Sequence, residues 1–278
     1  MRKVAILLTV GIKVGMAMKK TIIYVVLMVC SAAIFALTPE EKAAQEIENM
    51  KILSQMGLPL PGSGIKLVPR SRLNLSPEEI QQGDKEMVEF REKGYVNKFI
   101  NRPRELLRMN EAFVKKELMK SAGKTNDTST DLSSDVNEIK LAFKFPSISK
   151  NKMLAASSSN IHLLAAAPKG GFHEDKGGWS GASQFFTYRG IGTCSYSVMN
   201  VKAANTAALL AQEDVTYTIN NKATILMPVE GSESSGFLYY IKWYDNQNFH
   251  ELECANMKYS AETNNSVIAL ANQIDSYQ

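Results

Sequence analysis

Histidine and cysteine are the side chains with which this sequence could do chemistry. His173 precedes Glu174 and Asp175 in a glycine-rich segment beside Trp179, and a histidine next to carboxylates can act as a base or bind a metal ion. The spacing fits no zinc motif, because no second histidine follows four residues later and His162 stands alone. We therefore predict a solvated loop at His173, and we expect no metal site and no cofactor.

The segment from Gly192 to Asn200, GTCSYSVMN, surrounds Cys194 with small and polar residues. It resembles the cysteine box of the L,D-transpeptidases, periplasmic enzymes that crosslink peptidoglycan with a cysteine nucleophile. Only the cysteine and the later asparagine match, because the histidine and glycine before the cysteine and the arginine after it are absent here. We therefore assign no family. A periplasmic or secreted hydrolase or transpeptidase that uses His173, Cys194 or His250 is kept as the alternative function.

The cysteine count indicates one disulfide bond. Of the three cysteines, Cys30 lies in an N-terminal segment that export would remove or lipidate, which leaves Cys194 and Cys254 as a pair. In an oxidising compartment such a pair forms a disulfide. Two buried thiols are the alternative if the chain is not exported. An enzyme that uses Cys194 as its nucleophile would require this cysteine to be free, because a disulfide-bonded sulfur is not a nucleophile.

Residues 1–36 are typical of a signal peptide. A positive segment at Met18-Lys19-Lys20 precedes the apolar residues 21–35, and cleavage after Ala36 would leave a polar N-terminus. Met18 is an alternative start of the chain. An uncleaved anchor is disfavoured, because about 15 apolar residues are fewer than the roughly 20 that span a bilayer.

Cys30 offers a second interpretation of the same segment. Leu27, Met28 and Val29 precede it, which resembles a lipobox, although Val29 is larger than the residue usual at that position. Acylation of Cys30 would make the protein a lipoprotein. Contact with a membrane is therefore expected only through the signal peptide or through this lipid.

The charge of the chain argues against nucleic acid as a partner. The 278 residues carry a formal charge of +4, but the first 36 hold five basic residues and no acid. The remainder has 27 basic and 28 acidic residues, a net charge of −1. A nearly neutral protein has no global electrostatic attraction for nucleic acid.

Residues 37–120 are predicted to be helical. Thr38-Pro39-Glu40-Glu41 and Ser76-Pro77-Glu78-Glu79 each combine a hydroxyl cap, a proline at the first helical position and a glutamate three residues after the cap. We predict helices from Thr38 to about Met56, from Pro77 to about Gly94, and from Asn101 to about Lys120. Residues 121–137 are polar and small, as in a flexible linker.

Residues 138–278 are predicted to form an α+β domain. We expect a strand at Glu138–Phe145, a short helix and then a glycine-rich loop within Ser147–Gly181, strands at Gln184–Tyr188 and Ile191–Val201, and a helix at Ala203–Gln212. Two further strands, Val215–Ile219 and Ala223–Val229, are joined by Asn220-Asn221 as a tight turn. A closing amphipathic helix is expected at Ser260–Ile274, with Val267, Ile268, Leu270 and Ile274 facing inward.

The most regular stretch is Gly236 to Met257, which reads as an aromatic hairpin. The turn-forming residues Asp245–Asn248 place Tyr244 opposite Phe249, Trp243 opposite His250, Lys242 opposite Glu251, and Tyr239 opposite Cys254. One face then carries Phe237, Tyr239, Ile241, Trp243, His250, Leu252 and Cys254, which is a core face. His250 is expected to be a histidine at the edge of the core rather than a catalyst.

The other face of the hairpin is the predicted binding surface. Aromatic and charged side chains alternate there, which suits stacking on a sugar or contact with a peptide. Its candidate residues are Tyr240, Lys242, Tyr244, Phe249 and Glu251. Coverage by the protein's own helices is the alternative.

Together these features predict a fold class, a cellular location and a general function. We expect an α+β protein with a helical N-terminal region, a mostly antiparallel sheet, a C-terminal helix and one disulfide. We expect an exported bacterial envelope protein, periplasmic or secreted, that binds a protein or cell-wall partner without catalysis.

Overall fold

The structure is a computed structural model that describes residues 65–73, 75–121, 135–148, 160–206, 208–245 and 247–276. The predicted signal peptide 1–36, Cys30 and the predicted helix Thr38–Met56 lie outside these residues, as does most of the predicted linker 121–137. In the described part, the chain is an α+β structure with a mostly antiparallel sheet, a C-terminal helix and one disulfide, as the sequence predicts.

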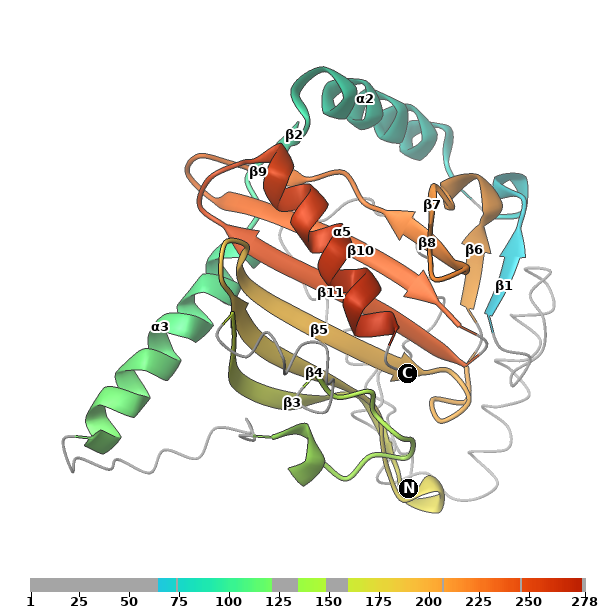
Figure 1. Ribbon diagram of the computed structural model, residues 1–278. Helices are drawn as coiled ribbons and strands as arrows, with labels where there is room; N and C mark the ends of the chain where they lie inside the picture. The colour runs from blue at the N-terminus through green and yellow to red at the C-terminus, as the bar shows by residue number, and fades with distance from the viewer. Residues whose placement is uncertain are drawn as a thin grey trace, which may run out of the picture.

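A nine-stranded sheet organises the chain (Figure 1). Its main path runs in the order β2-β9-β10-β11-β5-β4-β3, and β8 pairs with both β10 and β7. Every pairing is antiparallel except that of β2 with β9. The strands are β2 Val96–Asn97, β3 Ile161–His173, β4 Gly178–Tyr188, β5 Gly192–Asn200, β7 Tyr217–Ile219, β8 Lys222–Leu226, β9 Glu230–Ser232, β10 Gly236–Tyr244 and β11 Asn248–Asn256.

Different elements cover the two faces of this sheet. Helix α5, Ala261–Asp275, lies across one face (Figure 1), and its Val267, Leu270 and Ile274 enter the main core. Helix α3, Arg102–Ser121, packs on the other face, where Leu106 meets Leu238 and Phe185. A separate parallel pair, β1 Ile65–Val68 with β6 Ala208–Ala211, covers more of that second face. The sheet is therefore a buried central layer.

The ends of helix α2, Pro77–Lys93, follow from its sequence. The Ser76 hydroxyl accepts a hydrogen bond from the Glu79 backbone, and the Glu79 side chain accepts one from the Ser76 backbone, which completes the predicted capping box. Gly94 ends the helix at a φ of 80°. This left-handed conformation favours glycine, and a Cβ atom at Gly94 would also meet the Tyr259 hydroxyl.

The predicted strand at Glu138–Phe145 is wrong. A short 3-10 helix, η3 Val136–Glu138, is followed by irregular chain, with one isolated bridge between Leu141 and Trp179. Phe143 and Phe145 still pack against the core. The alternating pattern thus reflects side-chain burial by an irregular segment, because a strand also needs a partner strand along its length.

Two further segments differ from the prediction for one physical reason. The segment Ser147–Gly181, expected to hold a short helix and then a glycine-rich loop, contains β3, the 3-10 helix η5 Glu174–Lys176 and the start of β4 in its described part, and its residues 149–159 lie outside that part. The segment Ala203–Gln212, expected to be a helix, forms a turn and then β6, whose four residues are buried against β1. In both cases strand pairing outweighs the helical preference of alanine and leucine.

The predicted turn and closing helix are confirmed. Asn220 and Asn221 adopt φ values of 47° and 65°, the left-handed conformation that a tight hairpin turn requires, and they join β7 to β8. Helix α5 begins after Ser260, whose hydroxyl accepts a hydrogen bond from the Thr263 backbone. Ile268 packs at the margin of the core and is only partly buried.

Candidate functional site

The β10–β11 hairpin has the predicted register. Tyr244 pairs with Phe249, Trp243 with His250 and Tyr239 with Cys254. The predicted core face is buried under α5 in the main core cluster. Local turn chemistry and a period of two therefore sufficed to place these side chains.

His250 lies in a buried aromatic stack. Its ring is parallel to those of Trp243 and Tyr196, with centroids 5.1 Å and 6.2 Å away. Its Nε2 lies 3.1 Å from Oδ2 of Asp245, and its Nδ1 lies 3.0 Å from the Tyr196 hydroxyl. The carboxylate only accepts, so Nε2–H donates to Asp245 and Nδ1 accepts from Tyr196. Each ring nitrogen thus has a partner.

The order carboxylate, imidazole, hydroxyl has the connectivity of a catalytic triad. However, His250, Tyr196 and Trp243 are fully buried, so a substrate cannot reach them. Burial raises the pKa of the Tyr196 hydroxyl well above its usual value and lowers the pKa of His250. The network therefore holds a neutral imidazole and a protonated phenol in the core, which is a structural role.

This network predicts a loss of stability on the acid side. Burial lowers the pKa of His250 below its ordinary 6.5, although Asp245 partly offsets the effect. Below pH 6.5 the unfolded chain therefore binds a proton that the folded chain excludes, and the free energy of unfolding falls. Asp245 adds a second contribution at lower pH. Burial opposes the charge of its carboxylate, but hydrogen bonds from His250, Asn248 and the backbone outweigh burial and lower its pKa. The free energy of unfolding therefore falls further below pH 3.8, the ordinary pKa of aspartate.

Urea unfolding between pH 4 and pH 8 tests this prediction, with the titration-silent His250→Gln variant as the matched control. We expect the slope of stability against pH between about 6.5 and 5 to be smaller in the variant than in the wild type. Equal slopes in the two proteins would contradict the assignment of a buried neutral imidazole.

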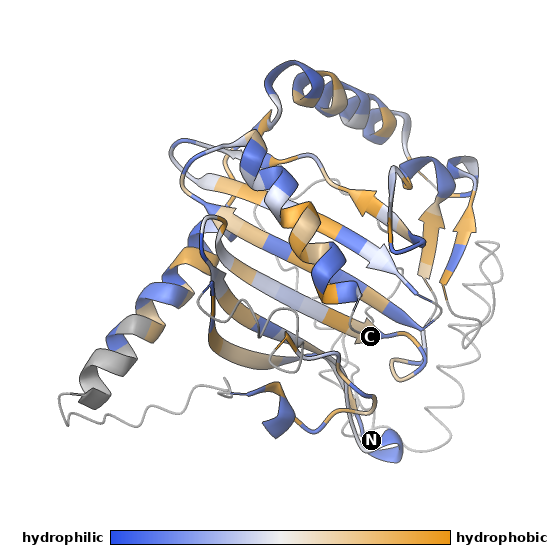
Figure 2. Ribbon diagram, viewed as in Figure 1, coloured by the Kyte–Doolittle hydropathy of each residue, from blue (hydrophilic) through white to orange (hydrophobic). Residues whose placement is uncertain are grey.

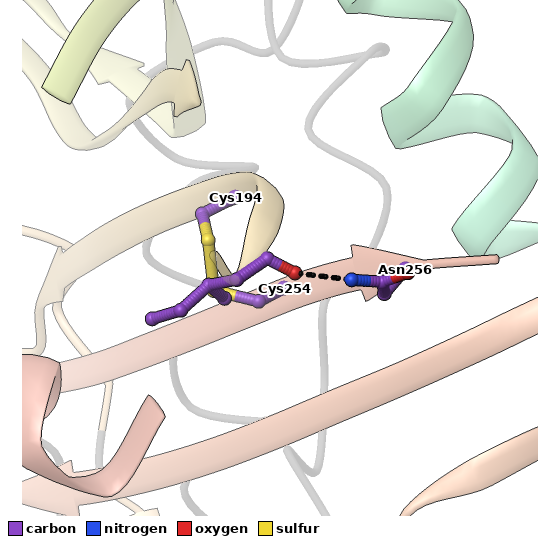
Figure 3. The surroundings of a disulfide bond; sticks show 4 residues. Cys194, Cys254 and Asn256 are labelled. Carbon is purple, nitrogen blue, oxygen red and sulfur yellow. Dashed lines mark hydrogen bonds between the residues drawn. A yellow bond between two sulfur atoms is a disulfide. The ribbon is translucent and has the colours of Figure 1, made fainter. Parts of the chain in front are cut away.

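Cys194 is bonded to Cys254 and so is not available as a nucleophile (Figure 3). The two cysteines face each other in neighbouring strands β5 and β11, with Cα atoms 4.1 Å apart, and both are fully buried. The Asn256 side chain donates a hydrogen bond of 2.9 Å to the Ile191 carbonyl oxygen beside them. The predicted pairing is therefore confirmed.

His173 lies apart from both residues, at the turn between β3 and β4. It pairs with Gly178 at the end of the hairpin, and Glu174 and Asp175 follow in η5. Burial lowers the pKa of His173, with a contribution from Lys176. Among the described residues, no group of three or more potential ligands is placed to hold a metal ion. The three predicted catalytic candidates are not brought together.

The predicted binding face of the hairpin is largely covered by the protein itself. Tyr244 and Phe249 are 4% and 6% exposed and pack with Met199, Leu210 and Ile225. Tyr240 packs near α3. This is the alternative that the sequence left open, because coverage depends on elements that are distant in the chain. Binding of a partner by these side chains stays a prediction, and our proposals do not depend on it.

Lys242 and Glu251 form the polar centre of that face. Glu251 accepts a hydrogen bond of 2.6 Å from the Tyr240 hydroxyl and pairs with Lys169, while Lys242 Nζ lies 3.9 Å from its Oε1. Lys242 is 6% exposed, and burial lowers its pKa to about 8 despite the attraction of Glu251. Burial opposes the charge of Glu251, but Lys169 and Lys242 outweigh it and lower its pKa. The residues neutralise one another inside the fold.

The described residues also form an open cavity of about 520 Å³, the α2 groove, between α2 and the chain from β8 to β9. One side of α2 forms a wall at helical spacing, with Ile80, Gly83, Asp84, Met87, Val88 and Arg91. The opposite wall consists of Ile225, Leu226, Met227, Pro228 and Glu230, and the lining also includes Arg70, Glu213, Asp214 and Thr216.

Helix α2 is held to the domain at its C-terminal end. Phe90 and Tyr95 pack against the main core, and the Tyr95 ring lies 5.1 Å from Phe237 and 5.0 Å from Tyr259. The side of the helix that faces the groove keeps exposed apolar residues: Ile80 at 41%, Met87 at 37% and Val88 at 53%. Figure 2 shows hydrophobic and hydrophilic residues alternating along this helix. The groove therefore has an apolar wall that this part of the chain leaves open.

Sequence reasoning identified helix α2 but missed the groove. Ile80, Met87 and Val88 recur at helical spacing in the sequence, and such a stripe usually marks packing between helices within one protein. The opposite wall comes from residues about 140 positions later, and no local pattern brings the two together.

Comparison of the chain with protein-family models, with curated proteins and with solved structures finds no match. In the described part of the chain, no helix is long and apolar enough to span a membrane.

Proposed function

We propose that this chain is an exported bacterial envelope protein, periplasmic or secreted, that acts as a non-catalytic binding module. The observation that carries the proposal is the α2 groove, with three apolar side chains exposed on one wall. Exposed apolar side chains that gather in a groove mark binding sites more often than the same residues scattered singly over a surface. The disulfide is compatible with an oxidising compartment.

The lining of the groove favours a protein over a cell-wall glycan as the partner. Sugars are commonly held by aromatic rings, and the described lining contains no aromatic residue. Aliphatic side chains and methionine, such as Ile80, Met87 and Met227, instead suit the apolar side chains of a polypeptide. We do not favour the hydrolase or transpeptidase alternative, because Cys194 is bonded, His250 is buried and His173 lies apart from both.

Photo-crosslinking in the bacterial envelope tests this function. With benzoylphenylalanine at Val88, on the groove wall, we expect one dominant adduct with another protein. The matched control carries the same group at Met257, which is similarly exposed at 49% and does not line the groove. We expect a Met87→Glu substitution to reduce the Val88 adduct by about fivefold or more, because a carboxylate in an apolar contact is costly. Equal adducts at Val88 and Met257 would contradict the proposal.

A further inference from the structure

We propose that the α2 groove binds a cationic amphipathic helix of a partner protein, with the apolar side of that helix against α2 and its basic side chains on the acidic rim. The inference rests on the proposed function and adds the chemistry of the partner. It follows from the size of the groove, from the apolar side chains on its walls and from the charged residues that line it.

The size of the groove and its apolar walls fit a partner helix that inserts a few side chains into it. One wall of the groove is a helix, and a cavity of about 520 Å³ has room for a few large aliphatic side chains rather than for a whole helix. Residues at positions i, i+3, i+4 and i+7 of a partner helix would enter it, as in other complexes in which a helix lies in a groove. The α2 residues that line the groove run from Ile80 to Arg91, so this wall is about 17 Å long at 1.5 Å per residue.

The rim is acidic. The lining contains five carboxylates, Asp84, Glu86, Glu213, Asp214 and Glu230, and two guanidinium groups, Arg70 and Arg91. Arg70 is already bound to Asp214, and its backbone N–H donates to Glu213 over 2.8 Å. Lys98 binds Glu230 and lies 3.8 Å from Glu86.

Counting Lys98 with the lining leaves an excess of two negative charges. Asp84 and Glu213 lie at exposed positions of this rim, where a partner can approach them. Complementary charge speeds association and selects against partners of the same sign. The rim therefore favours lysine or arginine on the partner and disfavours an anionic membrane surface or an acidic peptide.

Binding of synthetic peptides tests this inference on the full exported chain. The probe is a fluorescent helical peptide of leucine and lysine, long enough to form a helix at about 15 residues. A peptide with glutamate in place of lysine and a peptide with serine in place of leucine serve as comparisons. We expect the leucine–lysine peptide to bind at least about tenfold more tightly than either, and to weaken as salt rises from about 0.05 to 0.5 M.

Two charge reversals localise the site. Asp84→Lys changes the groove rim, and we expect it to weaken binding of the leucine–lysine peptide about fivefold. Asp175→Lys makes the same change at an exposed aspartate in η5, outside the groove, and is expected to leave the affinity unchanged. Circular dichroism of both variants verifies that they are folded.

The outcomes separate this inference from the proposed function. Equal binding of the glutamate peptide, equal effects of the two reversals, or no binding of any peptide to folded protein would overturn the cationic helix. Tighter binding of soluble peptidoglycan fragments at the groove would overturn it as well. If Val88 still crosslinks to a protein in those cases, the proposed function stands and only the partner chemistry fails. If the peptides do not bind and Val88 forms no crosslink, both the cationic helix and the proposed binding function are overturned.

Discussion

Replacing Cys194 and Cys254 together by alanine is expected to lower the free energy of unfolding by about 4 kcal/mol. The bond closes a loop with a sequence separation of 60 residues, and that loop contains β6 to β10. In the chain-entropy model, the bond stabilises the fold because it restricts the unfolded chain. Both sulfurs are fully buried in the main core, so the loss of their packing adds to the effect. Urea unfolding of the variant and the wild type measures the difference.

The reduced wild type is the matched control, because it keeps both cysteine side chains and lacks only the bond. We expect it to be less stable than the oxidised protein and more stable than the double alanine variant. Thiol titration of the unreduced, unfolded protein is expected to find neither Cys194 nor Cys254, so that only Cys30 can react if it is retained. Equal stability of oxidised and reduced protein would contradict a stabilising bond.

The parts of the fold that the sequence predicts well are those with local physical causes. Asp245 to Asn248 set the hairpin register, and a period of two then assigned every side chain to a face. Ser76 and Gly94 set the ends of α2 through a capping box and a left-handed residue. The cysteine pair followed from counting and from the expected compartment. Each of these depends on residues within one element or on simple elimination.

The errors arise where strand pairing outweighs the local preference of the residues for a helix. Leu209 and Leu210 in β6 favour a helix in isolation, yet β6 becomes a strand because β1 lies beside it. The alanines of β3, Ala165 to Ala167, are strand residues because β4 pairs with them along its length. The pairing of β1 with β6 joins segments that lie more than 140 residues apart in the sequence, and no local pattern encodes it.

The same limit explains the candidate sites. The aromatic face of the hairpin was identified correctly as a face, but whether it is open depends on α3 and β6, which pack there from elsewhere in the chain. Conversely, the stripe on α2 resembled ordinary helix packing, and the structure leaves Met87 and Val88 exposed beside β8. Sequence periodicity shows which side chains share a surface, and only the tertiary fold shows which surface stays uncovered.

Glu251→Gln is expected to lower the free energy of unfolding by about 3 kcal/mol near pH 7. The substitution keeps the shape of the side chain and removes the charge that neutralises Lys169 and Lys242. Most of the loss is expected from Lys242. An unpaired ammonium is more destabilising there, because Lys242 is almost fully buried whereas the Lys169 side chain is 30% exposed. Glu253→Gln is the matched control on the same face, and its effect should be smaller because its partner Arg102 is 30% exposed.

Two measurements identify the unpaired Lys242 ammonium as the cause. Lys242→Met added to Glu251→Gln removes the buried cation, and we expect the double variant to regain most of the lost stability. The deficit of the single variant should also shrink as the pH rises towards about 8, because the loss of Glu251 lowers the pKa of Lys242 further, so that the folded variant releases this proton at a lower pH than the folded wild type does. A double variant no more stable than Glu251→Gln, with a deficit that does not change with pH, would place the cost in lost hydrogen bonds to Tyr240 and Lys169.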